Sequence, residues 1–89
     1  MTSPDNKPSL GIVIPALNAA SGIAATLQSL EGGRAQFDLD IVVVDGGSRD
    51  DTVAVAREHG ARVITSEPGR GVQLAAGAGA VAGEGLVFL

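Results

Sequence analysis

An acidic side chain ends the most apolar part of this chain, and it is the residue best placed to bind a ligand. Residues 41–44 read Ile-Val-Val-Val, a β-branched run typical of a buried strand. Asp45 follows, and Gly46 and Gly47 then allow a sharp turn. Because ligands of open α/β sheets bind beyond the carboxyl ends of the strands, we expect Asp45 to face a binding site. The alternative is that Asp45 only favours the turn.

The residues after this turn have the pattern of a helix start. Ser48, with Asp51 three residues later, has the spacing of a capping box, and it predicts a helix over 51–59 that ends at Gly60. Asp50 and Asp51 also form a pair of acids that could hold a metal ion. Acids in the first turn of a helix complement its dipole, however, and we favour this structural interpretation.

Strands and helices alternate along the chain. A stripe of Ile23, Leu27 and Leu30 predicts a first helix, capped by Asn18 or Ser21 and ended by the glycines at 32–33. The further expected elements are strands at 10–17, 37–44, 62–65 and 85–89 and helices at 51–59 and 72–82. This alternation predicts an α/β fold with a parallel sheet of about four strands.

A glycine-rich segment at 77–83 imitates the dinucleotide-binding fingerprint. The fingerprint requires a strand before its first glycine and a helix after it, and here the order is reversed. We therefore expect these small residues to let a helix lie close to the sheet.

Composition excludes several classes of protein. The chain has 89 residues, enough for one domain, and no cysteine for disulfides or zinc-thiolate sites. Its net charge of −4, with six scattered Lys and Arg, argues against nucleic-acid binding. Residues 1–9 read as a disordered leader without the pattern of a signal peptide. No apolar run approaches the roughly 20 residues of a transmembrane helix, so a cytoplasmic or membrane-peripheral location is expected.

The last four residues, 86–89, are all apolar, as in a strand covered on both faces. The chain stops there without a polar tail, and we therefore expect a fragment or a truncated product. An unpaired apolar edge at this strand also predicts a homodimer that pairs through it.

The order and spacing of four motifs resemble those of family 2 glycosyltransferases, over residues 10–89. The resemblance implies a Rossmann-like fold of the nucleotide-diphosphosugar transferase type. The DGGS turn and the GRGxQ loop are similar to a bacterial subgroup linked to arsenosugar-type biosynthesis. The motifs that carry the resemblance are Ile12 to Asn18, Val42 to Thr52, Pro68 to Gln73 and Gly83 to Leu89.

The resemblance also implies a pocket for the donor nucleotide. Asp45 would accept a hydrogen bond from the base, usually uracil, because an ionised carboxylate is only an acceptor. Arg70 would reach the base or the diphosphate, although surface solvation is the alternative for this side chain. Gln73 is a further polar candidate. The remaining residues implied to line the pocket are Pro15, Ala16, Asn18, Gly46 and Gly47.

Two departures from the family pattern limit what the resemblance implies. Leu74 and Ala75 stand where many members carry Arg-Asn, which puts ligand contacts from this helix in doubt. The family's acidic metal-binding motif would follow Leu89, where the sequence ends. The complete enzyme would use Mg²⁺ or Mn²⁺, but no catalytic or metal-binding residue is assigned within these 89 residues.

The sequence is therefore consistent with two functions. The first is the donor-binding half of an inverting glycosyltransferase, whose partner is a nucleoside-diphosphate sugar that we expect to be UDP-linked. The second is a non-catalytic nucleotide-binding or regulatory module, such as a receiver domain with Asp45 as phosphoacceptor. A receiver domain predicts further acids at the end of the first strand, and residues 15–18 contain none.

Overall fold

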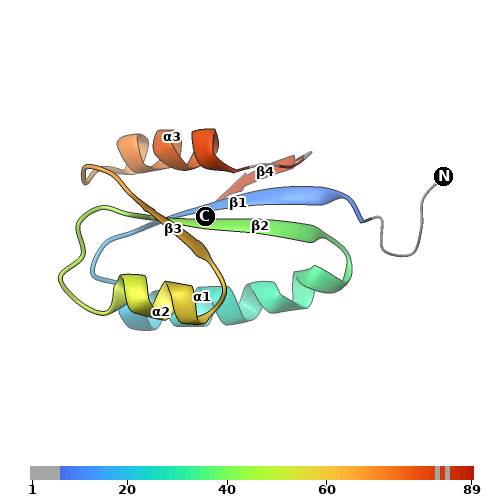
Figure 1. Ribbon diagram of the computed structural model, residues 1–89, viewed down its shortest axis with the longest axis horizontal. Helices are drawn as coiled ribbons and strands as arrows, with labels where there is room; N and C mark the ends of the chain where they lie inside the picture. Colours follow the sequence, from blue (N-terminus) through green and yellow to red (C-terminus); the bar gives the residue numbers. More distant parts are fainter. Residues whose placement is uncertain (1–6, 82, 84) are drawn as a thin grey trace.

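Four parallel strands form one sheet in the order β3-β2-β1-β4. The computed structural model describes residues 7–81, 83 and 85–89. Helices cover both faces of the sheet, which gives three layers (Figure 1). This arrangement confirms the predicted α/β, Rossmann-like fold. The strands are β1 (Ser9–Ala16), β2 (Asp38–Asp45), β3 (Arg62–Thr65) and β4 (Gly85–Phe88).

The register of the sheet sets where its loops meet. Strands β1 and β2 pair over their whole lengths, so Ala16 lies beside Asp45 at their carboxyl ends. Strand β3 reaches the same level, with Thr65 opposite Asp45, whereas Phe88 of β4 pairs with Val13. The carboxyl ends of β1 and β2 therefore extend past β4 and form the edge from which the first two loops leave.

Two helices, α1 (Ala20–Leu30) and α2 (Thr52–Glu58), cover one face of the sheet (Figure 1). The predicted stripe of α1 is confirmed, since Ile23 and Leu27 are buried in the core. The 3₁₀ helix η1 (Glu31–Ala35) continues from α1 and contains the two glycines expected to end the helix. The core residues contributed to this face by the sheet and by α2 include Ile12, Ile14, Ile41, Val43 and Ala56.

The third helix, α3 (Arg70–Ala80), covers the opposite face. It packs against Val13, Val42 and Val44, which are completely buried. Gly77 makes this close packing possible, because a Cβ at this position would overlap a methyl carbon of Val13. The interpretation of the 77–83 segment as small residues for helix packing is thus confirmed at Gly77.

The described part of the expected leader is tied to the fold. Residues 1–6 lie outside the described residues. The Lys7 ammonium donates a hydrogen bond to the Arg34 carbonyl at 2.8 Å, and the Pro8 carbonyl accepts one from the Asp38 N–H at 2.9 Å. Ser9 already belongs to β1, so the predicted leader boundary at residue 9 is too late. Pairing with β2 extends the strand beyond the apolar run that marked its start in the sequence.

Helix α3 begins two residues earlier than predicted. Gly69 precedes it with a φ of +136°, and its carbonyl accepts the Gln73 N–H at 2.9 Å. Arg70 and Gly71 are therefore in the first turn of α3 and not in a loop. Within the part of the chain that is described, no helix is both long enough and apolar enough to cross a membrane.

Candidate functional site

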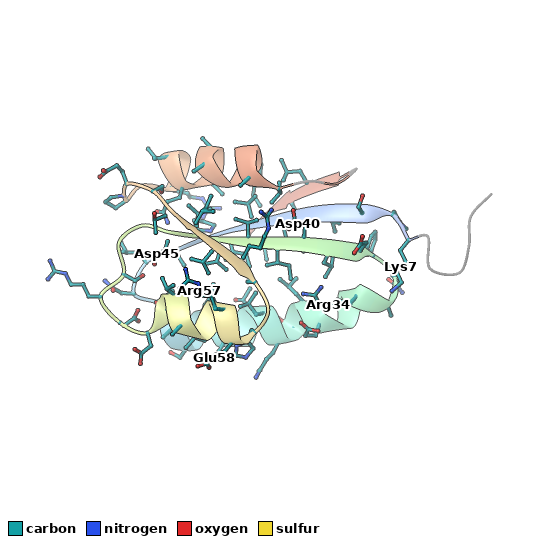
Figure 2. All side chains as sticks on the ribbon, in the orientation of Figure 1. Lys7, Arg34, Asp40, Asp45, Arg57 and Glu58 are labelled. Atoms are coloured by element: carbon teal, nitrogen blue, oxygen red, sulfur yellow. The ribbon has the colours of Figure 1, made fainter. Side chains whose placement is uncertain are left out.

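The candidate site lies at the carboxyl ends of β1 and β2, where the loops leading to α1 and α2 leave the sheet. Figure 2 shows Asp45 at this end and Lys7 at the opposite end. A pocket of about 200 Å³ opens here, lined by Pro15, Ala16, Leu17, Arg70 and Gln73. It therefore brings together four of the residues that the sequence predicted for the site.

The two carboxylate oxygens of Asp45 differ in their hydrogen bonding. The side chain is 3% exposed, and its Oδ2 accepts the N–H groups of Gly47 at 3.1 Å and Ser48 at 3.0 Å. This oxygen stabilises the turn, and Gly47 has a φ of +104° that favours glycine. The other oxygen, Oδ1, is buried and has no hydrogen-bond partner among the described residues.

An unpaired buried carboxylate oxygen is costly, since an unsatisfied buried polar group costs about 1–3 kcal/mol, and more when it is charged. A ligand N–H or O–H that bonds to Oδ1 would recover this free energy. Asp45 does not line the 200 Å³ pocket, so such a ligand must displace the groups that cover Oδ1. The turn and ligand roles weighed for Asp45 are therefore compatible, with one oxygen available for each.

Leu17 was not predicted as a site residue. It follows the last residue of β1, lines the pocket and is 47% exposed. Its position in the sequence could have identified it. An apolar side chain directly after the carboxyl end of a strand lies beyond the core and is therefore exposed at the place where ligands bind. Its exposed surface provides an apolar wall for a flat ligand group.

The loops after β1 and β2 are hydrogen-bonded to each other. The Asn18 N–H donates to the Ser48 hydroxyl oxygen at 2.8 Å, and the Arg49 N–H donates to the Asn18 carboxamide oxygen at 2.7 Å. The predicted capping roles of Ser48 and Asn18 are therefore wrong, because neither side chain caps α2 or α1. Asn18 adopts a φ of +49°, a conformation that asparagine tolerates. Its Nδ2 group has no partner among the described residues.

Asp50 and Thr52 make further hydrogen bonds between the start of α2 and the start of α1. Asp50 accepts the Thr52 N–H at 3.0 Å and the Ala20 N–H at 3.2 Å, and it also accepts the Thr52 hydroxyl. Thr52 is completely buried and accepts the Ala19 N–H at 2.9 Å. Asp50 therefore binds first-turn N–H groups of both α1 and α2. Asp50 and Asp51 both precede the first turn of α2, so their predicted place within that turn is wrong, and the Asp50 carboxylate instead accepts hydrogen bonds from the loop and helix starts.

These hydrogen bonds stabilise the charged form of Asp50. The bond from the Thr52 hydroxyl is the main cause that lowers the pKa of Asp50 below its ordinary value of 3.8, with smaller contributions from the N–H groups of Thr52 and Ala20. A lowered folded-state pKa stabilises the fold fully at pH values above 3.8, and this stabilisation is lost as the pH falls through the folded-state pKa.

We therefore expect the effect of Asp50→Asn on stability to depend on pH. The substitution should lower the free energy of unfolding at pH 6, and this loss should shrink at pH 3, which is below the ordinary value of 3.8, so that the carboxyl group of the unfolded chain is protonated there. Urea unfolding at both pH values measures it. Asp51→Asn is the matched control, since the Asp51 side chain makes no capping hydrogen bond. An Asp50→Asn loss that is equal at both pH values would contradict the expectation.

Gln73 is buried at the back of the pocket, with 5% exposure. Its Nε2 donates to the carbonyls of Ala16 at 3.1 Å and Val44 at 2.9 Å, and its Oε1 accepts the Gly69 N–H at 3.1 Å. A Cβ on Gly46 would lie 3.1 Å from the Gln73 carboxamide, so the close approach that Gly46 allows is to Gln73.

Arg70 has a different setting from Gln73, although both are on α3. Its side chain is exposed, lines the pocket, and makes no hydrogen bond or ion pair with any described residue. A guanidinium in this position is free to bind an anion such as a phosphate.

A second pocket, of about 190 Å³, lies at the opposite end of β1 and β2 and is lined by Ser9, Asp38, Leu39, Asp40 and Gly83. Asp40 is already held there by two hydrogen bonds from Arg62, at 3.0 and 2.9 Å. Because ligands of parallel sheets bind at the carboxyl ends of the strands, we place the candidate site at the other end.

The side chains that commonly bind divalent metal ions lie apart from one another in the described part of the chain. Across 7–81, 83 and 85–89, no group of three or more His, Cys, Asp or Glu side chains is arranged to hold one. Asp45 and Asp50 each use oxygens on backbone N–H groups. What the site offers is a recess at the strand ends, an unpaired buried acceptor and an exposed guanidinium.

Comparison with protein families gives a match to the model described as "Glycosyl transferase family 2" over residues 11–89. A 4,4'-diaponeurosporenoate glycosyltransferase of Staphylococcus aureus is 41% identical over 59 residues, which are 66% of this chain and 15% of that protein. The succinoglycan biosynthesis protein ExoA of Rhizobium meliloti is 40% identical over 57 residues, 64% of this chain and 16% of that protein. The chain thus spans about a sixth of the length of these relatives.

Among solved structures, the chain is similar to glucosyl-3-phosphoglycerate synthase of Mycobacterium tuberculosis in complex with Mn²⁺, UDP and glucosyl-3-phosphoglycerate. The TM-score is 0.81 at 29% identity, and the match covers 97% of this chain and 34% of the synthase. The same synthase with Mg²⁺ and UDP matches with a TM-score of 0.80, 29% identity and the same coverage. None of these names refers to arsenosugars, so that subgroup stays a prediction.

Proposed function

Because this chain belongs to glycosyl transferase family 2, we propose that it binds the nucleotide of a nucleoside-diphosphate sugar and that the whole protein transfers the sugar. The observation that carries the proposal is the buried Oδ1 of Asp45, which has no partner among the described residues and lies where parallel sheets bind ligands. The synthase that resembles this chain was crystallised with UDP, which supports a nucleotide at this place.

We propose uracil as the base, because its chemistry complements an acceptor. The ring of uracil carries an N–H that can donate to Asp45 Oδ1. Cytosine has an unprotonated ring nitrogen at the same place, which would meet the carboxylate as a second acceptor. An unpaired buried oxygen therefore discriminates between the two pyrimidines, in addition to binding the base.

The other predicted residues are proposed to hold the rest of the nucleotide. Pro15 and Ala16 line the pocket wall, and the Asn18 Nδ2 is available to a ribose or base oxygen. Gly46 and Gly47 are proposed to leave space for the nucleotide at this turn, because neither has a side chain. Arg70 is proposed to bind the diphosphate, whose negative charge matches its unpaired guanidinium.

We propose that the transfer step uses a catalytic base other than the site residues described above. In an inverting transfer, an acceptor hydroxyl loses its proton to a base and attacks the anomeric carbon, and the bond from that carbon to the diphosphate oxygen breaks. The site residues described above supply nucleotide binding, and we assign none of them as the base. We propose Mg²⁺ or Mn²⁺ for the complete enzyme, because the similar synthase was crystallised with each ion.

A titration of the ¹⁵N-labelled chain with UDP tests the proposal. We expect amide shifts concentrated at Asp45, Gly47 and Arg70, with little change at Asp38 and Leu39 in the opposite pocket. Inorganic diphosphate is the control ligand, and it should shift Arg70 without shifting Asp45. A dispersed spectrum that does not respond to UDP would contradict a uridine site. Equal shifts with several unrelated nucleotides would favour a general binding module.

We also propose that two copies associate through β4. Leu86 and Phe88 are large apolar side chains that are about half exposed, and an open strand edge pairs readily with another strand. Sedimentation equilibrium decides this point, because a monomer at all concentrations would reject it. We propose a cytoplasmic location as well. A vesicle-binding assay would show whether the protein also associates with the membrane surface.

A further inference from the structure

We propose that Gln73 is a positioning residue, which shapes the donor site without touching the nucleotide. This inference rests on the proposed function, because it concerns the same pocket. It differs from the direct contact predicted for Gln73 from the sequence. The reason for the difference is that both Nε2 hydrogens, and one acceptor position of Oε1, are already bonded to backbone groups of the protein.

The Gln73 carboxamide joins three parts of the fold. Its two Nε2 hydrogens bond to Ala16 at the end of β1 and to Val44 next to the end of β2. Its Oε1 accepts the N–H of Gly69, the residue that precedes α3. Both donors are used and the side chain is 5% exposed, so it offers a nucleotide no hydrogen to bind.

An amide is the side-chain group that suits these partners. Two carbonyls require two donors, and the N–H of Gly69 requires an acceptor. A glutamate of the same length would present two acceptors to the carbonyls, and a methionine would present neither donor nor acceptor of comparable strength. The buried site therefore selects glutamine by its hydrogen-bonding pattern as well as by its size.

Gly69 connects this amide to the ligand-binding part of the pocket. It adopts a φ of +136° and is followed directly by Arg70, the first residue of α3. The bond from Gly69 to Gln73 holds the segment at the point where the chain enters the helix. Because the Arg70 guanidinium has no partner among the described residues, its place depends on the backbone at this point.

A double-mutant cycle separates positioning from contact. Gln73→Met keeps the length of the side chain and removes its hydrogen bonds. In the wild-type background we expect it to weaken UDP binding about tenfold, which is about 1.4 kcal/mol. In an Arg70→Ala background we expect less than about a twofold further loss, because the residue that Gln73 positions is then absent. Isothermal titration calorimetry with UDP measures all four dissociation constants.

The alternatives give different results in this cycle. An equal loss in both backgrounds would mean that Gln73 affects UDP binding independently of Arg70 and would overturn the proposal. Unchanged UDP affinity in a folded Gln73→Met variant would also overturn it, while leaving the nucleotide site intact. Failure of the wild-type chain to bind UDP would instead reject the proposed function. Amide exchange should in addition be faster at Gly69 and Arg70 in ligand-free Gln73→Met than in ligand-free wild type.

A measurement on the wild-type chain covers the case in which Gln73→Met does not fold. The Gln73 side-chain amide protons give their own NMR signals. We expect no nuclear Overhauser effect between these protons and UDP, while Leu17 and Arg70 show such effects. A clear effect from UDP to the Gln73 amide would place the nucleotide in contact with this side chain and would overturn the proposal.

Discussion

The substitution Asp45→Asn is expected to change which pyrimidine nucleotide binds. The carboxamide introduced by this substitution would keep an oxygen that accepts the N–H groups of Gly47 and Ser48, as Oδ2 does in the native chain. Its NH₂ group would then replace Oδ1, and a donor would meet the ring N–H of uracil. UDP affinity should fall at least about tenfold, since a buried polar group left unpaired costs about 1–3 kcal/mol.

The same change should favour CDP, because the ring nitrogen of cytosine accepts the hydrogen bond that the new NH₂ group donates. Calorimetric titration of both proteins with UDP and CDP measures the ratio of the two affinities. Asp38→Asn is the matched control, since it removes one negative charge from the opposite end of β2. An unchanged ratio in a folded Asp45→Asn variant would show that Oδ1 does not contact the base.

Local sequence patterns were sufficient for the fold because they agreed with its long-range contacts. The β-branched run at 41–44 becomes the buried middle of β2, and the stripe of Ile23 and Leu27 faces the sheet. A run of this kind is too apolar for an edge or a surface, so it fixes its own place between two layers of helices. The strand at 62–65 was predicted with the same bounds that the structure gives it.

The candidate site was only partly predictable for a physical reason. Asp45 could be found because its position after a buried strand is a local feature. Ser48 and Asn18 carry the local signal of helix caps, yet their partners lie about 30 residues away in the other loop. A side-chain oxygen accepts from whichever N–H group the fold brings near, and the spacing in the sequence does not say which one that is.

Gln73 shows the same limit more strongly. Its place in the GRGxQ motif, at the start of the helix expected over 72–82, suggested a polar residue available to a ligand. In the folded chain, β1, β2 and the segment before α3 come together around Gln73, and their backbone groups form hydrogen bonds with its carboxamide. Burial of a polar side chain by three separate segments leaves no periodic signal in a sequence.

The substitution Gly77→Ala is expected to destabilise the fold strongly, although alanine is the better helix former. The new Cβ would overlap Val13 Cγ1 and would lie 2.9 Å from Val44 Cγ2. Both valines are fully buried in the middle of the sheet, and β-branched side chains have few rotamers into which they can move. Helix α3 must therefore move away from the sheet, and overpacking of this kind costs about 1–3 kcal/mol.

Gly79→Ala provides the matched control on the same helix. A Cβ there would meet no atom within 4 Å, so this variant should gain about 0.5–1 kcal/mol from helix propensity alone. Urea unfolding of the two variants measures opposite shifts in the midpoint. Because α3 begins with Arg70 and carries Gln73, its displacement in Gly77→Ala should also weaken UDP binding, whereas Gly79→Ala should bind as the native chain does. Two alanine variants of equal stability would show that α3 does not pack on the sheet at Gly77.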